Sequence, residues 1–510
     1  MDRRVVNADG SVESELRHPA EVVMTESGKP KTYARRWFVM LSIALSYASW
    51  NMHTSRQVII APTYAKWFDI PNESFSSDGV GVDFMSVLDS LILLFSYFPA
   101  SYVIDRYGMK MSMIGAFAIA LSSWIWYASG HNYTGVLIGR SIASVLGPTV
   151  SSCVLATSNR WFPENERAIA TAIISLFSLL GSGAALLSAS PFYTTDYEIV
   201  DITLKSCDTS TLSATQLATV IAATSNGTNV VCDDAYADAK DAFCCYQPTD
   251  IPTYNLMMAI IPTFTFFLVC IFVRNSPPTP PSTAALKKDH TTFVQGTKIL
   301  FGNERFLKLA ISDFIVSGPP LVLYSSISRV FPADISGYSF IAAAIGVVLA
   351  IPTAIVVAFL LDRYSRYYTF TAGGYTTGTF FWIIAMICYL VDTTESHWGF
   401  FTMVIFALCV FIAWQTAVYE TKLEYVFSPE VFLEGMITGW DRAVINCSNL
   451  VFVSSLAPEV VGSAKLTFII GAVIMVIGCL PVLLIKQKTK YQRLAYEQSK
   501  AQGTSENLAV

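Results

Sequence analysis

The sequence "VIDRYGMK" (103–110) returns as "LLDRYSRY" (360–367) in the second half of the chain. Each copy follows an apolar run that is long enough to cross the hydrocarbon core of a bilayer, about 30 Å thick, as a helix. Each copy also ends the second apolar run in a series of six. The repeat therefore predicts two six-helix halves of similar construction, with both Asp-Arg-Tyr turns on the same side of a membrane.

The composition also indicates a membrane protein. Of the 510 residues, 53% are hydrophobic and only 14% are charged, whereas a soluble protein carries about 25% charged residues. The net charge of −5 lies in loops and tails and gives no reason to expect nucleic-acid binding. We expect an all-α membrane protein whose twelve transmembrane helices form two six-helix bundles, which is the organisation of major facilitator transporters.

The expected spans divide the chain into two bundles and a linker. They lie near 37–65, 82–104, 110–129, 134–158, 168–192 and 253–273, and then near 306–328, 338–361, 367–391, 398–426, 436–457 and 465–485. The N-terminal bundle is thus 37–273, the linker 274–305 and the C-terminal bundle 306–485.

Lysine and arginine in the short loops predict the orientation. With the N-terminus inside, the basic residues collect on the inner side and few remain outside, so we expect both termini in the cytoplasm. Residues 1–36 and 486–510 are expected to be disordered, solvated tails without a cleavable signal peptide. The plasma membrane is the default location, and we expect a monomer.

Residues 193–252 form the one large outer loop, which is acidic and carries four cysteines. These are Cys207, Cys232, Cys244 and Cys245. On the oxidising side of the membrane they favour one or two disulfides, with three pairings possible, over a zinc site that would lack histidine. Sequons at Asn72, Asn132 and Asn226 also fall on the outer side and are candidate glycosylation sites.

The linker begins with "NSPPTPPSTA" (275–284). Proline removes backbone donors and holds an extended path, so the preceding span cannot continue as a helix. Residues 286–306 are expected to form an amphipathic helix along the inner membrane surface. The linker then joins two bundles that move against each other, although a role as a peptide ligand stays open.

The repeated turns are candidate gating elements. A turn after the first Asp-Arg-Tyr needs Gly108, and the acidic residue in each copy adds nothing to topology, which favours a contact between helices over charge placement alone. Candidate gating residues are Asp105, Arg106, Gly108, Lys110, Asp362, Arg363, Asp441 and Arg442. The last two, within about two turns of the cytoplasmic end, are expected to be interhelical clamps or inner-gate groups.

Several stretches resemble one family, the feline leukaemia virus subgroup C receptor-related proteins of the major facilitator superfamily. They are "PPTPPS" (277–282), "RRWFVML" at the first span, "FPASYVIDRYGMK" at the second, "SNRWFPENERAIATAI" (158–173), and "GYSFIAAAIGVV" with "LLDRYSRYY" in the eighth and ninth. The likeness covers most of the first nine spans and fades towards "FSPEVFLEG" (427–435).

The resemblance implies facilitated transport of choline, ethanolamine or haem. It implies a choline site made of an aromatic cage with glutamine contacts. Tyr324 matches the family's tyrosine, whereas Gly147 and Asn446 stand where the family has glutamines. Trp50 lies within about a turn of the family's tryptophan.

Ionisable residues inside spans are functional candidates, because each costs roughly 2.5–3.5 kcal/mol on insertion scales. They are His53, Arg56, Asp89, Arg140, Asp313, Asp441 and Arg442. Arg56 and Asp89 lie at similar depth and are expected to form a structural pair or to face substrate. His53 is either a proton relay or a packed neutral histidine.

These residues leave the substrate class open. Trp50 and Tyr324 suit a quaternary ammonium through cation–π contact, whereas Arg56 and Arg140 suit a carboxylate or phosphate. The sequence "SGPP" (317–320) is expected to break the seventh span close to Tyr324.

We expect a transporter of a small organic solute, with no cofactor or metal. The first expectation is a carrier of an amine or of haem, and the second is a proton-coupled carrier of an amino acid or organic anion. A non-transporting receptor is the alternative from another class. An enzyme is not expected, since no catalytic motif occurs.

Overall fold

The computed structural model describes the two helical bundles and their connections. The described residues are 5–6, 12–13, 32–68, 70, 75–76, 79–82, 84–189, 251–282, 285, 292–325, 330–391, 393–429, 431–456, 458–485 and 491–501. The loop cysteines and the sequons at Asn72 and Asn226 lie outside these residues. Asn132 lies inside them and is exposed, and its side chain caps the helix that follows.

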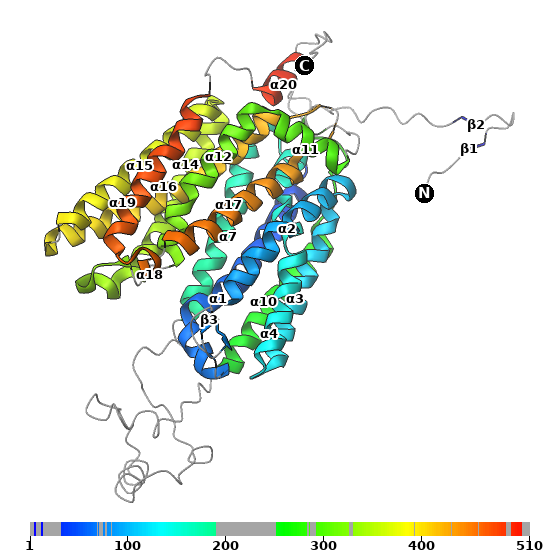
Figure 1. Cartoon of the computed structure of the whole chain (residues 1–510). Coiled ribbons are helices and arrows are strands. Elements are labelled where there is room, and N and C mark those ends of the chain that lie inside the picture. The colour runs from blue at the N-terminus through cyan, green and yellow to red at the C-terminus, as the bar shows by residue number, and fades with distance from the viewer. Residues whose placement is uncertain are drawn as a thin grey trace, which may run out of the picture.

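Long helices occupy all twelve predicted positions (Figure 1). In the N-terminal bundle they are α1 (Arg35–Phe68), α2 (Phe84–Tyr107), α3 (Ser112–Ser129) after η1 (Met109–Met111), the broken helix α4 (Tyr133–Leu146), α5 (Pro148–Ser151) and α6 (Cys153–Trp161), α7 (Arg167–Ala189) after η2 (Glu164–Glu166), and α10 (Ile251–Phe272).

The C-terminal bundle has the same number of long helices in the described chain. They are α12 (Glu304–Ser325), α14 (Ser339–Tyr364) after η7 (Ala333–Tyr338), α15 (Tyr367–Val391), α16 (Thr394–Val426), α17 (Glu434–Leu456) and α19 (Ala464–Leu483). Shorter elements are α11 (Phe293–Gly302), α18 (Pro458–Val461), α20 (Gln492–Ala501) and the antiparallel pairs β1 (Val5–Val6) with β2 (Val12–Glu13) and β3 (Phe75–Ser76) with β4 (Gly79–Val80).

Among the described residues, ten of these helices are long and apolar enough to cross a membrane. The two long helices that fall short of this hydropathy, α1 and α17, carry ionisable residues in mid-helix. Large apolar side chains such as Phe95, Phe264 and Val348 point outward from the bundles, as expected of surfaces that face lipid.

Small residues allow the helices to approach closely inside each bundle, as is usual in membranes. A Cβ at Gly181 of α7 would collide with the backbone of Ala48 in α1. A Cβ at Gly374 of α15 would collide with the Trp414 ring of α16. Both helix pairs are among the most extensively packed in the molecule.

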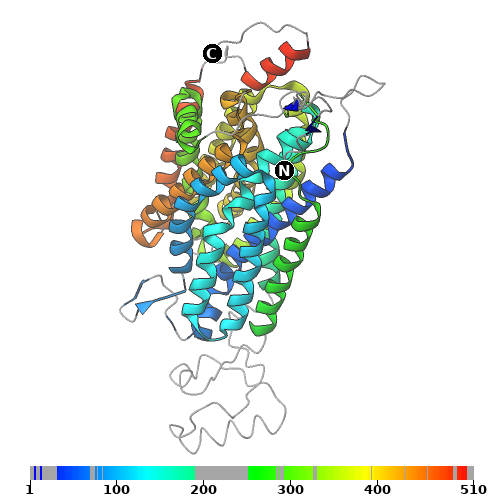
Figure 2. The same cartoon turned by 90° about the vertical axis from the view of Figure 1, so that its right-hand side faces the viewer.

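The two bundles meet along α2 with α17 and along α7 with α14. α15 and α19 lie on one side of the molecule and α3, α4 and α10 on the other (Figure 1). α11 and α20 lie at one end of the molecule, which we call the α20 end, and the β3–β4 hairpin lies at the other, the β3 end; Figure 2 shows the same separation.

Two expectations about the connections need correction. The tail after residue 485 was expected to be solvated, but α20 within it packs against α16 and buries Arg493. The cause is a pair of buried carboxylates on α16, described below. The lateral helix, expected over 286–306, is α11 and is shorter, because Asn303 ends it and caps α12 by accepting bonds from Arg305 N and Phe306 N.

Span 7 also differs from expectation. The "SGPP" sequence was expected to break it, but α12 continues through Pro319 and Pro320 to Ser325. Pro319 packs against Gly471 of α19. A Cβ added at Gly471 would lie only 3.2 Å from the Cβ of Pro319. Neighbouring helices thus accommodate the two prolines without a break.

Candidate functional site

Asp105, at the end of α2, caps a helix of the opposite bundle. Its two carboxylate oxygens accept hydrogen bonds from Gly435 N at 2.9 Å and Met436 N at 2.8 Å, in the first turn of α17. A carboxylate there satisfies free amides and interacts favourably with the positive end of the helix dipole. This contact joins the two bundles at the α20 end.

Arg160 of α6 extends the same contact. Its Nη2 lies 3.3 Å from Glu434 and 3.5 Å from Asp105, and its guanidinium stacks on Phe432 at 4.1 Å. Asn159 donates to Glu434 at 2.6 Å. These groups are buried, so the network holds α2 and α6 against the start of α17 without exposure to water.

Asp362, at the end of α14, makes the equivalent contact in the reverse direction. Its carboxylate accepts bonds from Ala168 N at 3.1 Å and Ile169 N at 3.2 Å, in the first turn of α7. The aspartate of each repeat copy therefore caps a helix that belongs to the other bundle.

The third inter-bundle contact at the α20 end involves Glu420 of α16. Thr171 of α7 donates to Glu420 Oε1 at 2.7 Å. The second oxygen, Oε2, lies 2.7 Å from Arg493 Nη2, and Arg493 Nε lies 2.6 Å from Glu424 Oε1. The tail helix α20 thus bonds a carboxylate that also bonds the opposite bundle.

Tyr491, just before α20, fixes the tail helix further. Its hydroxyl accepts a hydrogen bond from Tyr368 N at 3.1 Å, and its ring packs against Tyr367 at 5.1 Å. Burial raises the pKa of the Tyr491 hydroxyl above its ordinary value, so it accepts this bond as a neutral phenol.

The turn between α2 and α3 is anchored to the linker. Gly108 has φ 91°, and a Cβ there would collide with the Asn275 side chain. Asn275 donates to Tyr107 O at 3.3 Å and accepts from Lys110 N at 2.9 Å. The start of the linker is therefore bound to the N-terminal bundle.

The basic candidates of the two turns take no part in these contacts. Lys110 and Arg363 are exposed and Arg106 is half-buried. Within the described chain, none of the three forms an ion pair with the opposite bundle. Their exposed or half-exposed positions are those expected of topology-setting charges.

A second group of residues meets between the bundles, further from the α20 end. The guanidinium of Arg442 on α17 lies 5.6 Å from the ring of Tyr47 on α1 and 5.4 Å from that of Tyr419 on α16. Asn446 lies one turn further along α17 and donates to Arg442 O at 2.8 Å. We call Tyr47, Trp50, Tyr97, Tyr419, Arg442 and Asn446 the central cluster.

Trp50 lies one turn from Tyr47 on α1. Its ring lies 6.1 Å from Tyr47 and 6.3 Å from Tyr97 of α2. A Cβ at Gly147 would approach Trp50 Cε2 to 3.1 Å, so the absence of a side chain at Gly147 makes room for the indole. Trp50 Nε1 is a buried donor that has no partner in the described part of the chain.

His53 and Arg56 turn away from the central cluster. A helix advances about 100° per residue, so Arg56, nine residues after Tyr47, points from the opposite side of α1. His53 lies between the Ser122 and Ser123 hydroxyls of α3, at 2.9 Å from each. Both side chains therefore lie inside the N-terminal bundle.

Asp89 pairs with Arg140 and not with Arg56, which corrects one expectation. Arg140 Nη2 lies 2.8 Å from Asp89 Oδ2. Arg140 also donates to His53 O at 2.7 Å and Thr54 O at 3.0 Å. The pair forms because Arg140 on α4 faces both α1 and α2, whereas Arg56 faces α3.

The C-terminal bundle contains a charge cluster that sequence reasoning missed in part. Lys422 of α16 bridges Asp313 of α12 and Asp441 of α17, and the Tyr375 hydroxyl of α15 donates to Asp313. Lys422 is fully buried. Asp441, expected to be an interhelical clamp or an inner-gate group, links α17 to α16 inside its own bundle.

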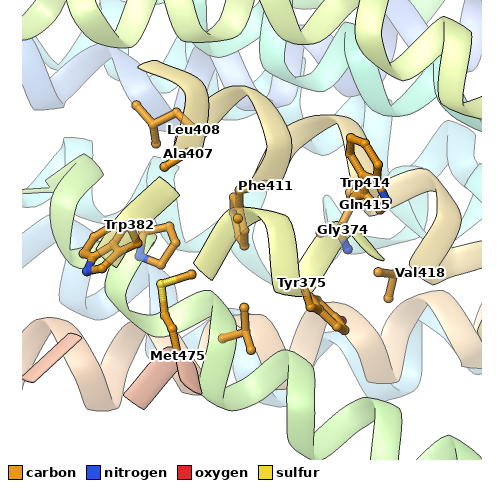
Figure 3. A pocket seen from close by; sticks show the side chains of 13 residues that line it. Gly374, Tyr375, Trp382, Ala407, Leu408, Phe411, Trp414, Gln415, Val418 and Met475 are labelled. Atoms are coloured by element: carbon orange, nitrogen blue, oxygen red, sulfur yellow. The ribbon is translucent and has the colours of Figure 1, made fainter. Parts of the chain in front are cut away.

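A pocket opens beside this cluster, between α12, α15, α16 and α19. Figure 3 shows Trp382, Phe411, Tyr375 and Met475 around it, with Gln415 and Trp414 at one end. The lining is mostly aromatic and apolar. Gln415 Nε2 is a buried donor for which the residues that the structure describes provide no acceptor. All its lining residues belong to the C-terminal bundle.

The chain matches the Major Facilitator Superfamily over residues 39–197 and 247–422, well over half of its length. It belongs to that superfamily. The predicted major facilitator fold is thereby confirmed. This superfamily consists of transporters and not, in general, of enzymes.

One curated relative is Solute carrier family 49 member A3 of Xenopus tropicalis, 27% identical over 168 residues. The match covers 30% of this chain and 32% of the relative, so the chain spans about a third of that protein's length. It supports a solute carrier.

Solved structures share the major facilitator fold. The E. coli fucose:proton symporter has a TM-score of 0.60 at 11% identity, covering 88% of this chain and 98% of that one. The human organic anion transporter TETRAN has a TM-score of 0.53 at 10% identity, covering 88% and 99%. At such identities the likeness concerns the fold alone.

Within this major facilitator fold, the structure brings together only some of the predicted site residues. Trp50, Asn446 and Arg442 lie in the central cluster. His53, Arg56, Asp89 and Arg140 lie inside the N-terminal bundle. The helix α12 passes through Tyr324, but the side chain of Tyr324 lies outside the described part of the structure.

Proposed function

We propose that this superfamily member carries a small organic solute across the membrane by alternating access, and that the structure represents its outward-open state. The inter-bundle contacts of Asp105, Asp362 and Glu420 support this, because all three lie at the α20 end. The predicted orientation makes the α20 end cytoplasmic. One weaker contact, Asn449 Nδ2 to Ser90 Oγ at 3.5 Å, lies further towards the β3 end.

The central cluster is the proposed substrate site. It lies between the two bundles, apart from the contacts of Asp105, Asp362 and Glu420. Its residues belong to helices that must separate and approach during transport. The observation that carries the proposal is the position of Arg442, which lies against Tyr47 of one bundle and Tyr419 of the other. A substrate bound there contacts both halves at once.

Arg442 favours a substrate with an anionic group. A guanidinium binds carboxylate or phosphate through two parallel hydrogen bonds, and it repels a simple cation in a poorly hydrated site. The rings of Tyr47, Trp50 and Tyr97 provide an apolar, aromatic surface beside it. We infer an organic acid or a zwitterion with an apolar portion, and haem fits this chemistry.

An amine is the second candidate. The aromatic contacts of Trp50 with Tyr47 and Tyr97 suit cation–π binding of choline or ethanolamine. The resemblance to the feline leukaemia virus subgroup C receptor-related proteins also supports it. Gly147 and Asn446, which replace the glutamines of that family, weaken this support.

Uptake into cells tests the two candidates side by side. Labelled haem, an amphipathic carboxylate, choline and ethanolamine are compared for wild type, Arg442→Gln, Trp50→Ala and Tyr324→Ala, with the exposed Arg363→Gln as control. Saturable uptake of an anionic solute that Arg442→Gln abolishes at equal surface expression supports the first proposal. Amine uptake that survives Arg442→Gln and is lost in Trp50→Ala or Tyr324→Ala overturns it in favour of the second.

A further inference from the structure

Arg56 is a fully buried arginine inside the N-terminal bundle, at 0% exposure. It lies near the β3 end of α1, and its guanidinium carbon lies 3.3 Å from the ring centroid of Trp126 on α3. Because it points away from the central cluster, it is separated from the proposed substrate site by the body of α1 itself.

The charges around Arg56 do not balance. The groups that face it are Arg140, His53, Tyr64 and Tyr254. Arg140 is neutralised by Asp89 at 2.8 Å, and no acidic side chain pairs with Arg56 in the part of the chain that the structure describes. One positive charge therefore stays uncompensated at a site without solvent exposure, which costs several kcal/mol.

The hydrogen bonds around Arg56 do not balance either. Its Nε, Nη1 and Nη2 atoms are all buried without a partner among the described residues, and so is Nε1 of Trp126. The nearby Tyr64 hydroxyl donates to Asn255 Oδ1 at 2.8 Å and accepts no hydrogen bond from Arg56. The site thus presents several donors, and each unsatisfied buried donor costs about 1–3 kcal/mol.

We propose that Arg56 and Trp126 Nε1 bind a small inorganic anion, such as chloride, inside the N-terminal bundle. An anion only accepts hydrogen bonds and carries negative charge, so one bound ion corrects both imbalances. A water molecule would accept at most two of these bonds and would leave the charge uncompensated. The proposal does not depend on the transported substrate.

Thermal unfolding of the purified full-length protein tests the proposal. Wild type is compared in sodium chloride, bromide, formate and gluconate at equal ionic strength, beside Arg56→Met and the control Arg167→Met, which removes another buried arginine at the start of α7. We expect the wild-type Tm to rise with chloride or bromide and to saturate, and Arg167→Met to keep this rise. Arg56→Met should lose it and should be more stable than wild type in gluconate, because it removes an uncompensated charge.

The opposite results overturn the proposal. A wild-type Tm that ignores halide, or an Arg56→Met variant that keeps the halide effect, excludes an anion at Arg56. Stabilisation by formate without stabilisation by chloride assigns a carboxylate instead of an inorganic ion. If Arg56→Met does not fold, anomalous diffraction from wild-type crystals in bromide decides: a peak at hydrogen-bond distance from Arg56 supports the site, and its absence refutes it.

Discussion

Asp105 and Asp362 cap helices in each other's bundle. Each ends the second long helix of its half, and each accepts two backbone bonds from the first turn of a helix across the interface. The repeat found in the sequence is thus also a repeat of contacts. In the proposed mechanism these two caps must break together when the cytoplasmic side opens.

Removing both caps should open the α20 end. Hydrogen bonds to a charged group contribute about 1.5–3 kcal/mol each, so Asp105→Asn with Asp362→Asn shifts the equilibrium towards the open state by at least about tenfold. Tyr107 and Tyr364 are the last residues of α2 and α14 and are exposed at 58% and 57%. Spin labels at Tyr107→Cys and Tyr364→Cys therefore report the distance between the ends of these two helices.

We expect longer distances in the double variant than in wild type. Lys308→Gln removes a surface ion pair with Glu304 and serves as control, since such pairs contribute about 0–1 kcal/mol. Identical distance distributions in the double variant and wild type would show that the caps do not hold the bundles together.

Releasing α20 should loosen the same end. Arg493→Ala leaves Glu420 and Glu424 buried without their arginine, and such a loss is strongly destabilising locally. Hydrogen exchange should become faster in α20 and in the first turn of α7. Gln498→Ala, an exposed change on α20, should leave both rates unchanged; equally slow exchange in Arg493→Ala contradicts the docking role.

Substitution of Gly108 and of Gly373 by alanine should change the thermal stability in different ways. Gly108→Ala forces a side chain into positive φ and against Asn275, at about 1–3 kcal/mol for the backbone strain alone. Gly373 lies inside α15 with no atom near the added Cβ, so Gly373→Ala should be neutral or stabilise by about 0.5–1 kcal/mol. Thermal unfolding compares them, and an equal loss in both would rule out the strain at Gly108.

The protein should need Lys422 for its stability only while Asp313 and Asp441 are charged. Lys422→Met leaves Asp313 and Asp441 buried without a cation, which costs about 3–5 kcal/mol. Combining it with Asp313→Asn and Asp441→Asn should recover most of the lost thermal stability. A triple variant no more stable than Lys422→Met would show that the cluster does not act through charge compensation.

The sequence predicts the fold well because hydrophobic span length and the repeated turn report directly on helices and halves. It also marks Asp105 and Asp362, since an acid beside topology-setting bases is otherwise unexplained. It cannot identify their partners: free amides at a helix start, such as Gly435 N, leave no trace in residue type.

Other residues were missed for physical reasons. Lys422 lies in "YETKLEY" (419–425), near the end of a span, where a lysine is ordinarily at the membrane surface. The tail around Arg493 has a polar composition that predicts solvation, and only the buried Glu420 and Glu424 overturn it. The opposite directions of Tyr47 and Arg56, by contrast, follow from helix periodicity and were available from the sequence.

Access to Asn446 from the two sides of the membrane tests alternating access about the central cluster most directly. Asn446→Cys, in an otherwise cysteine-free chain, is treated with a membrane-impermeant thiol reagent from outside or inside. We predict reaction from outside, and reaction from inside only when Asp105→Asn and Asp362→Asn are added. Two results would contradict the account. One is reaction from inside when Asp105 and Asp362 are unchanged, and the other is no reaction from either side with or without the two aspartate substitutions.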